Sequence, residues 1–180
     1  MDQNLRKYCV CAVFTALCAI CSQIQIPLPM VPINLALFAV NLAGALLGAK
    51  PGAVSVAAYV LLGALGAPVF AGFAGGMQAI AGQTGGYILG YILAASLVGW
   101  LRARWGIGWL RLCAAMALGT AVCYAFGTVW FMAVTRMGLW ASLAYCVFPF
   151  LAGDAVKIAL ATTLTRRLAL PLRAIGWEIH

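Results

Sequence analysis

The segment INLALFAVNLAGALLGAKPGAVSVAAYVLLGALG, residues 33–66, contains a single charged residue, Lys50, between two long apolar blocks. This composition is typical of the whole chain, because 66% of its 180 residues are hydrophobic and only 8% are charged. Soluble domains carry about 25% charged residues, since they face water on all sides. Lipid is the solvent that suits so apolar a surface. The sequence therefore predicts an all-α membrane protein with several membrane-spanning helices.

Pro, Gly and basic residues divide the chain into six apolar blocks. We expect one integral membrane domain over residues 1–180, folded as a six-helix bundle. The expected helices cover about 7–24, 33–48, 52–66, 84–102, 111–135 and 141–166. The first 24 residues begin like a signal peptide but show no cleavage pattern, so they are interpreted as a retained helix. The second and third helices are shorter than the roughly 20 residues of a full span, and a re-entrant pair is the alternative.

The basic residues predict how the bundle is oriented. With a cytoplasmic N-terminus, nine of the eleven Lys and Arg residues fall on the inside, Arg136 falls outside, and Lys157 lies within a span. Cytoplasmic loops carry such an excess of positive charge. We therefore expect both termini in the cytoplasm. The net charge of +8 is dispersed between apolar blocks, and this distribution argues against a nucleic-acid partner.

A glycine-rich connection, GAPVFAGFAGGMQAIAGQTGG, spans residues 66–86 and should face outside. Connections of this length in compact domains are usually functional or disordered. The apolar side chains of Phe70, Phe73 and Met77 favour packing over solvation. We expect this connection to form a lid against the outer mouth of the bundle.

The last expected helix contains an acid and a base, Asp154 and Lys157, in the otherwise apolar stretch FLAGDAVKIALAT at 150–162. A charge near the bilayer centre costs about 2.5–3.5 kcal/mol on insertion scales. The i, i+3 spacing places both residues on one face, where they can pair. In one interpretation the pair only braces the bundle. In the other, the two side chains face a cavity and meet a polar ligand.

Further polar residues are expected at the same outer level as Asp154. They are Asn34, Gln78, Gln83, Thr84 and Tyr87. Each could be a helix cap or a loop residue, and Thr84 is a plausible N-cap. Together they predict a pocket with donors and acceptors. Its aromatic walls would come from Phe70, Phe73 and Tyr87, a mixture that suits a small, partly polar molecule.

The chain offers little for catalysis or for nucleotide binding. Its one histidine is the last residue, His180, and no convincing nucleophile and base pair is present. The glycines of 81–91 are not followed by a lysine, so the motif is no phosphate-binding loop. Cys18 and Cys21 lack the further ligands of a metal site. We expect no enzyme activity, no metal and no cofactor.

Two pairs of small residues are spaced for close helix contact. Gly86 and Gly90 form G-x-x-x-G, for which packing is the favoured role over ligand binding. Ala12 and Ala16 are also four apart. They fit either packing inside the bundle or docking to a separate membrane partner, and the residues alone leave these alternatives open.

Three ordered segments resemble the BioY family, the biotin-specific substrate-binding (S) components of energy-coupling factor (ECF) transporters. These segments are residues 26–76, GQTGGYILGY at 82–91 and GDAVK at 153–157. The likeness extends over about 8–165. It implies a six-helix membrane protein of the bacterial cytoplasmic (inner) membrane that binds biotin near the external surface. It also implies import with a transmembrane coupling subunit and a pair of ATPases.

The resemblance also assigns roles to individual residues. It maps biotin contact onto Asp154 and Lys157, and it favours the docking role for the Ala12 and Ala16 pair. Two positions depart from the family pattern. Ala36 stands where the family usually has Gln, with an amide at Asn34 instead, and Gln83 stands where the family usually has Pro.

Two alternatives to a biotin-binding component remain. One is an S component for another vitamin, although Lys157 disfavours cationic thiamin. The other is a structural membrane protein in which Asp154 and Lys157 only brace the bundle. Because the chain has no ATP-binding motif, we expect it to depend on partners for active uptake.

Overall fold

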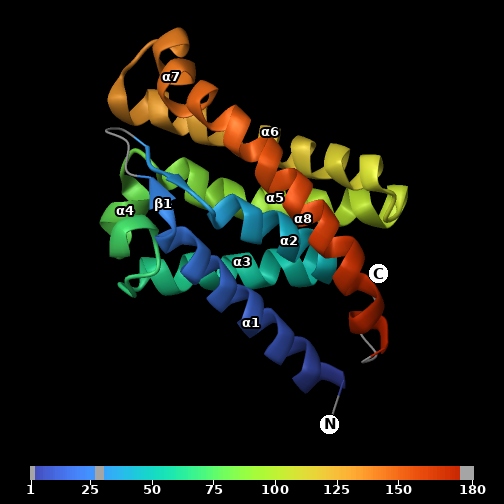
Figure 1. Ribbon diagram of the computed structural model, residues 1–180. Coiled ribbons are helices and arrows are strands. Elements are labelled where there is room, and N and C mark those ends of the chain that lie inside the picture. The colour runs from blue at the N-terminus through green and yellow to red at the C-terminus, as the bar shows by residue number, and fades with distance from the viewer. Residues whose placement is uncertain (1–2, 27–30, 175–180) are drawn as a thin grey trace.

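The computed structural model describes the backbone of residues 3–26 and 31–174 and the side chains of residues 5–26 and 31–169. It is a helical bundle with a pair of short strands at one end (Figure 1). The longer helices are α1 (Gln3–Gln23), α2 (Ala36–Leu47), α3 (Ala49–Ala64), α5 (Gly85–Trp105), α6 (Trp109–Thr135), α7 (Leu139–Cys146) and α8 (Phe148–Ala174). The shorter elements are β1 (Gln25–Ile26), β2 (Ile33–Asn34), the 3-10 turn η1 (Ala71–Phe73) and α4 (Met77–Ala81).

All six predicted apolar blocks form helices, and the fold class is confirmed. Among the described residues, α1, α5 and α6 are each long and apolar enough to cross a membrane, and α7 with α8 forms a fourth, bent candidate. Helices α2 and α3 are apolar but shorter. The chain is therefore a multi-pass membrane protein.

The second helix begins later than predicted. Residues 33 and 34 pair as β2 with β1 in antiparallel register, and α2 starts at Ala36. The Asn34 side chain explains the boundary, because its Oδ1 accepts a hydrogen bond from the Ala36 N–H at 3.1 Å. Asn side chains that bond to the backbone two residues on favour a turn over a continuing helix.

The predicted helix 141–166 is wrong as one element, because it is broken at Val147. The axes of α7 and α8 differ by 42° across this break. Pro149 accounts for the break, since a proline inside a continuous helix lacks the N–H and clashes with the carbonyl four residues earlier. The break places Pro149 in the first turn of α8, where proline is tolerated.

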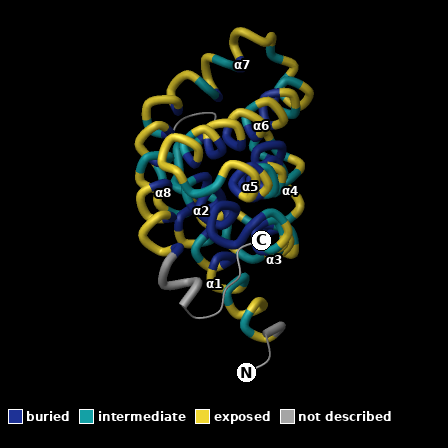
Figure 2. Tube along the Cα trace, turned by 90° about the vertical axis from the view of Figure 1, so that its right-hand side faces the viewer, coloured by how far each residue is buried: buried dark blue, intermediate teal, exposed yellow. Residues whose placement is uncertain are grey.

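The centre of the bundle is α2, which is buried on all sides except at Phe38 (Figure 2). A helix that is apolar on nearly every face belongs in a core, and its one polar side chain, Asn41, is buried and donates to the Thr120 hydroxyl. It packs against α1, α3, α5 and α8. Its 12 residues span only about 18 Å. The cavity described below lies at its N-terminal end, next to Asn34 and Leu37.

Close contact between α5 and α6 explains the G-x-x-x-G pair. A Cβ built on Gly90 would lie 3.2 Å from the Cys123 Sγ and 3.3 Å from the Cys123 Cα. A Cβ on Gly86 would overlap the Trp130 side chain. The predicted packing role of both glycines is confirmed, and this contact brings the aromatic residues of α5 beside those of α6.

Candidate functional site

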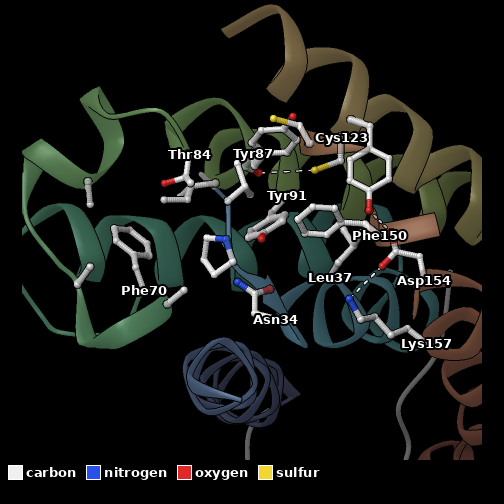
Figure 3. A pocket seen from close by; sticks show the side chains of 18 of the residues that line it. Asn34, Leu37, Phe70, Thr84, Tyr87, Tyr91, Cys123, Phe150, Asp154 and Lys157 are labelled. Atoms are coloured by element: carbon white, nitrogen blue, oxygen red, sulfur yellow. Dashed lines mark hydrogen bonds and ion pairs between the residues drawn. The ribbon is translucent and has the colours of Figure 1, made fainter. Parts of the chain in front are cut away.

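A cavity of about 200 Å³ lies at the end of the bundle where α2 begins (Figure 3). Helices α2, α3, α5, α6, α7 and α8 contribute to its lining. Two connecting segments add to it, one before α2 and one between α3 and α5. The site is thus assembled from distant parts of the chain, as is usual for pockets between helices of a bundle.

Aromatic side chains make up much of the wall of the cavity. They are Tyr59, Phe70, Tyr87, Tyr91, Tyr124 and Phe150. The rings meet edge to face. The ring centroids of Tyr87 and Tyr124 lie 6.3 Å apart, and those of Tyr124 and Phe150 lie 6.4 Å apart. Such arrangements stabilise aromatic clusters and fix the orientation of the rings. The cavity therefore offers flat apolar surfaces to a ring-containing ligand.

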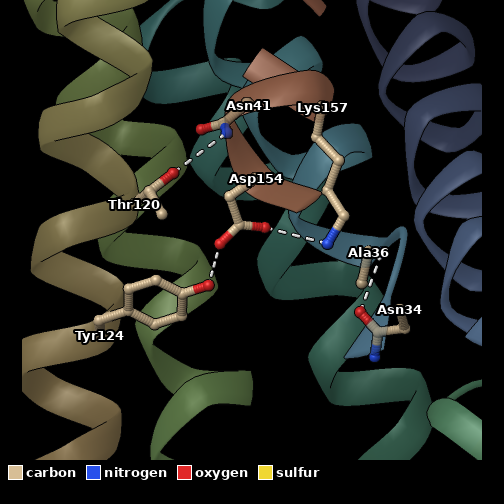
Figure 4. A network of polar contacts seen from close by, with 7 residues as sticks. All are labelled: Asn34, Ala36, Asn41, Thr120, Tyr124, Asp154 and Lys157. Atoms are coloured by element: carbon tan, nitrogen blue, oxygen red, sulfur yellow. Dashed lines mark hydrogen bonds and ion pairs between the residues drawn. The ribbon is translucent and has the colours of Figure 1, made fainter. Parts of the chain in front are cut away.

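The acid and the base of α8 meet in this cavity. Lys157 Nζ lies 3.0 Å from Asp154 Oδ1, and the two residues are 7% and 3% exposed. The Tyr124 hydroxyl donates to the other carboxylate oxygen, Asp154 Oδ2 (Figure 4). Burial makes these charge-assisted bonds stronger than they would be in water.

The ion pair retains capacity for a ligand. Within the described part of the chain, Lys157 bonds only Asp154, so one of its three N–H donors is in use. Each oxygen of Asp154 has one protein partner and can accept another hydrogen bond. A polar group that enters the cavity thus meets a donor and an acceptor side by side.

Five of the predicted site residues line the cavity. They are Asn34, Thr84, Tyr87, Asp154 and Lys157. Thr84 stands at the predicted N-cap position of α5 but makes no side-chain cap bond. The Tyr87 hydroxyl lies 3.2 Å from the Thr128 Oγ1, which orients the ring against α6. Phe70, one of the three aromatic residues predicted for the walls, also lines the cavity.

The other three predicted residues lie outside the lining. Phe73 is 72% exposed, although Phe70 in the same turn faces the cavity. The turn is tight, with the Phe70 N–H bonded to the Ala74 carbonyl, and Phe73 adopts a left-handed backbone with φ 58°. One ring therefore points inward and the other does not. Gln78, on α4, and Gln83, in the turn before α5, are both exposed.

The connection predicted to be a lid forms one wall of the cavity. Its contribution comes from Phe70, Ala71, Ala74 and Ala79. The expectation that Met77 packs against the bundle is wrong, because this side chain is 66% exposed. Phe70 is thus the one large apolar side chain of this connection in the lining, and the other apolar side chains that face the cavity are alanines.

Sequence analysis missed the tyrosines that shape the cavity from three helices. Tyr59 comes from α3, Tyr91 from α5 and Tyr124 from α6. A partial signal exists in the spacing of Tyr87 and Tyr91, which are four apart and so share a helix face. The contact of Tyr124 with Asp154 has no signal along the chain, because the two residues are brought together by the packing of α6 on α8.

The small residues of α1 face away from the bundle. Ala12 and Ala16 are both exposed, whereas Phe14 and Cys18 on the same helix are buried. The alternative in which Ala12 and Ala16 pack inside the bundle is therefore wrong.

Within the described residues, no group of three or more His, Cys, Asp or Glu side chains could hold a metal ion.

The fold and the cavity define a multi-pass membrane protein with a site for a small, partly polar ligand. Comparison with known proteins identifies the family of this membrane protein. The model of the BioY family matches residues 1–174. The chain belongs to the BioY family.

Relatives and a solved structure agree with this assignment. The chain is 37% identical over 165 residues to the biotin transporter BioY of Thermotoga maritima, with 91% of this chain and 96% of that protein covered. It is 39% identical over 157 residues to the probable biotin transporter BioY of Pyrococcus horikoshii, with 87% and 92% covered. Both relatives are named as transporters and not as enzymes.

A crystal structure gives the same fold. The S-component for biotin from an ECF-type ABC transporter matches with a TM-score of 0.86 and 29% sequence identity, and 93% of this chain and 94% of that chain are covered. The likeness therefore extends over nearly the whole chain.

Proposed function

We propose that this protein binds biotin in the cavity and presents it for import as the S component of an ECF-type vitamin transporter. The observation that carries the proposal is the aromatic cavity that contains the buried Asp154, Lys157 and Tyr124 network. The similarity to biotin transporters and to an S-component for biotin supports biotin as the ligand.

The chemistry of biotin suits this cavity. Its fused rings are apolar enough to pack against the tyrosines and Phe150. Its ureido group has two N–H donors and one carbonyl acceptor on adjacent atoms. Asp154 can accept from the N–H groups while Lys157 donates to the carbonyl, since the two side chains lie next to each other. We propose that the ureido group meets this pair and that the valerate chain extends toward the connecting segments.

Biotin is expected to raise the melting temperature of the solubilised protein by several degrees. A ligand that binds only the folded state at 100 times its Kd adds about 2.7 kcal/mol of stability. The measurement is a biotin titration followed by melting temperature and by tryptophan fluorescence. Thiamin and riboflavin serve as controls and should have no effect.

The titration also separates the competing interpretations. Stabilisation by another vitamin and not by biotin would contradict the proposed ligand. No stabilisation by any of the three would favour a structural role for the ion pair. Biotin methyl ester, which has no charge on its tail, should still bind if the ureido group meets Asp154 and Lys157.

We further propose that the protein acts with a transmembrane coupling subunit and a pair of ATPases in the bacterial cytoplasmic (inner) membrane, with both termini in the cytoplasm. The close structural likeness to an S-component from an ECF-type ABC transporter supports such partners. The exposed Ala12 and Ala16 face of α1 supports a docking surface, because small residues let a second helix approach closely.

Changing both Ala12 and Ala16 to leucine is expected to abolish most biotin uptake while biotin binding stays unchanged. The added side chains meet solvent or lipid in the isolated protein, since both positions are exposed. They would prevent close approach of a partner helix. Uptake of labelled biotin by cells that supply the coupling subunits gives the first readout, and binding to purified protein gives the second. Normal uptake by the double variant would contradict docking on this face.

A further inference from the structure

The last residue of α1, Gln23, holds the backbone of the cavity wall with both ends of its side-chain amide. Its Nε2 donates to the Phe70 carbonyl at 3.0 Å. Its Oε1 accepts from the Phe73 N–H, also at 3.0 Å. The neighbouring Ser22 hydroxyl donates to the Val69 carbonyl. One turn of α1 therefore makes three hydrogen bonds to the segment 69–74.

The segment held in this way contributes directly to the cavity. Phe70 is 3% exposed, lines the cavity and packs edge-on against Tyr59, with ring centroids 5.5 Å apart. Ala71 and Ala74 line the same wall. A Cβ on Gly63 of α3 would overlap the Phe70 ring, so this ring fits closely over α3. Displacement of the segment would remove Phe70 from the cavity wall.

Apart from the packing of the Phe70 ring, few other contacts hold the segment to its neighbours. Between Val69 and Ala74, the side-chain hydrogen bonds that the structure describes from another element all come from Ser22 or Gln23. The Phe70 N–H bonds within the segment, to the Ala74 carbonyl. Segments with few anchors open at a lower free energy than the packed helices around them. Opening of this wall therefore gives a ligand in the cavity a route out.

We propose that Gln23 is a positioning residue that holds the 69–74 wall closed over the bound ligand and so slows its release. The inference rests on the proposed function for the identity of the ligand, biotin. Gln23 does not line the cavity, and it acts through Phe70, Ala71 and Ala74. Its effect should appear in the dissociation rate, because the chemistry of the cavity itself is unchanged.

The test uses Gln23→Met, which keeps the length of the side chain and removes the amide. Solubilised protein is loaded with labelled biotin and chased with an excess of unlabelled biotin. Loss of the two hydrogen bonds is expected to raise the dissociation rate at least about fivefold, with the association rate changed by less than about twofold. Ser22→Ala removes the third bond and should give a smaller rise in the same direction.

The matched control is Thr163→Val. Thr163 lies on the exposed face of α8, and among the described residues its side chain bonds only the Ala159 carbonyl of its own helix. This variant should release biotin at the parental rate. If Gln23→Met is folded, as judged by its melting temperature, and releases biotin no faster than the control, the inference is overturned. A rise in dissociation rate for Gln23→Met and not for Thr163→Val supports it.

A second measurement needs no ligand and keeps this inference separate from the proposed function. The Phe73 N–H donates to Gln23, so hydrogen exchange over residues 69–74 should be about tenfold faster in Gln23→Met than in the parent, without added biotin. Unchanged exchange would overturn the role of Gln23 even if the parent binds biotin tightly. Faster exchange in Gln23→Met, together with a parent protein that binds no biotin, would support the role of Gln23 in holding the 69–74 wall and would contradict the proposed ligand.

Discussion

Lys157→Met is expected to lower the affinity for biotin at least about 30-fold. Removing one member of a buried, hydrogen-bonded charge pair at a binding site costs about 2–5 kcal/mol or more, and about 1.4 kcal/mol corresponds to a factor of ten. Two effects add here. The ligand loses the donors of Lys157, and Asp154 keeps only Tyr124 as a partner among the described residues. Isothermal titration of the solubilised variant gives the affinity.

The stability of the variants distinguishes ligand recognition from simple bracing. Lys157→Met leaves the Asp154 carboxylate buried without its counter-charge, so the melting temperature should fall as well. The double variant Asp154→Leu with Lys157→Met removes both charges. Replacing a buried ion pair with apolar residues of similar size is often neutral or stabilising, so most of the lost stability should return. Biotin binding should not return.

The outcome of the double variant is decisive for the role of the pair. Recovered stability together with parental biotin affinity would show that Asp154 and Lys157 only brace the bundle. Lys50→Met is the matched control, because it removes an exposed lysine at the start of α3. It should change neither the affinity nor the melting temperature by a comparable amount.

Sequence analysis found the ion pair for a physical reason. Charged residues are costly in a membrane helix, so Asp154 and Lys157 stand out from the apolar residues around them. The six apolar blocks were predictable on the same grounds, because lipid demands nearly continuous apolar helices. Both signals are strong because charged residues and interrupted helices are rarely tolerated in the lipid core.

The aromatic residues of the cavity could not be selected in this way. Tyr91 and Tyr124 occur in helices with several aromatic residues, and Tyr59 is the one aromatic residue of α3. Apart from the four-residue spacing of Tyr87 and Tyr91, nothing along the chain says which of these rings face a cavity. Their direction depends on how the helices are rotated against each other, which is set by contacts such as that of Gly127 with Tyr87. Side-chain direction was equally unpredictable in the connection between α3 and α5, where Phe70 faces the cavity and Phe73 does not.

Gly127→Ala is expected to lower both biotin affinity and stability, because Gly127 leaves room for a tyrosine of the cavity. A Cβ at this position of α6 would overlap the ring of Tyr87. The ring lines the cavity, and its hydroxyl is held by Thr128. Overpacking of this kind costs about 1–3 kcal/mol, or about 5- to 150-fold if it is expressed in binding. Relief of the overlap moves Tyr87 toward the cavity or separates α5 from α6.

The direction of the stability change makes this substitution informative. Glycine inside a helix is about 1 kcal/mol less favourable than alanine, so Gly→Ala stabilises a helix where space allows. Gly153→Ala is the matched control, because a Cβ at that position of α8 meets no atom within 4 Å. It should raise the melting temperature or leave it unchanged, with biotin affinity preserved. A parental affinity and melting temperature for Gly127→Ala would mean that the α5 and α6 contact does not fix the position of Tyr87, and that the cavity tolerates a shift of this ring.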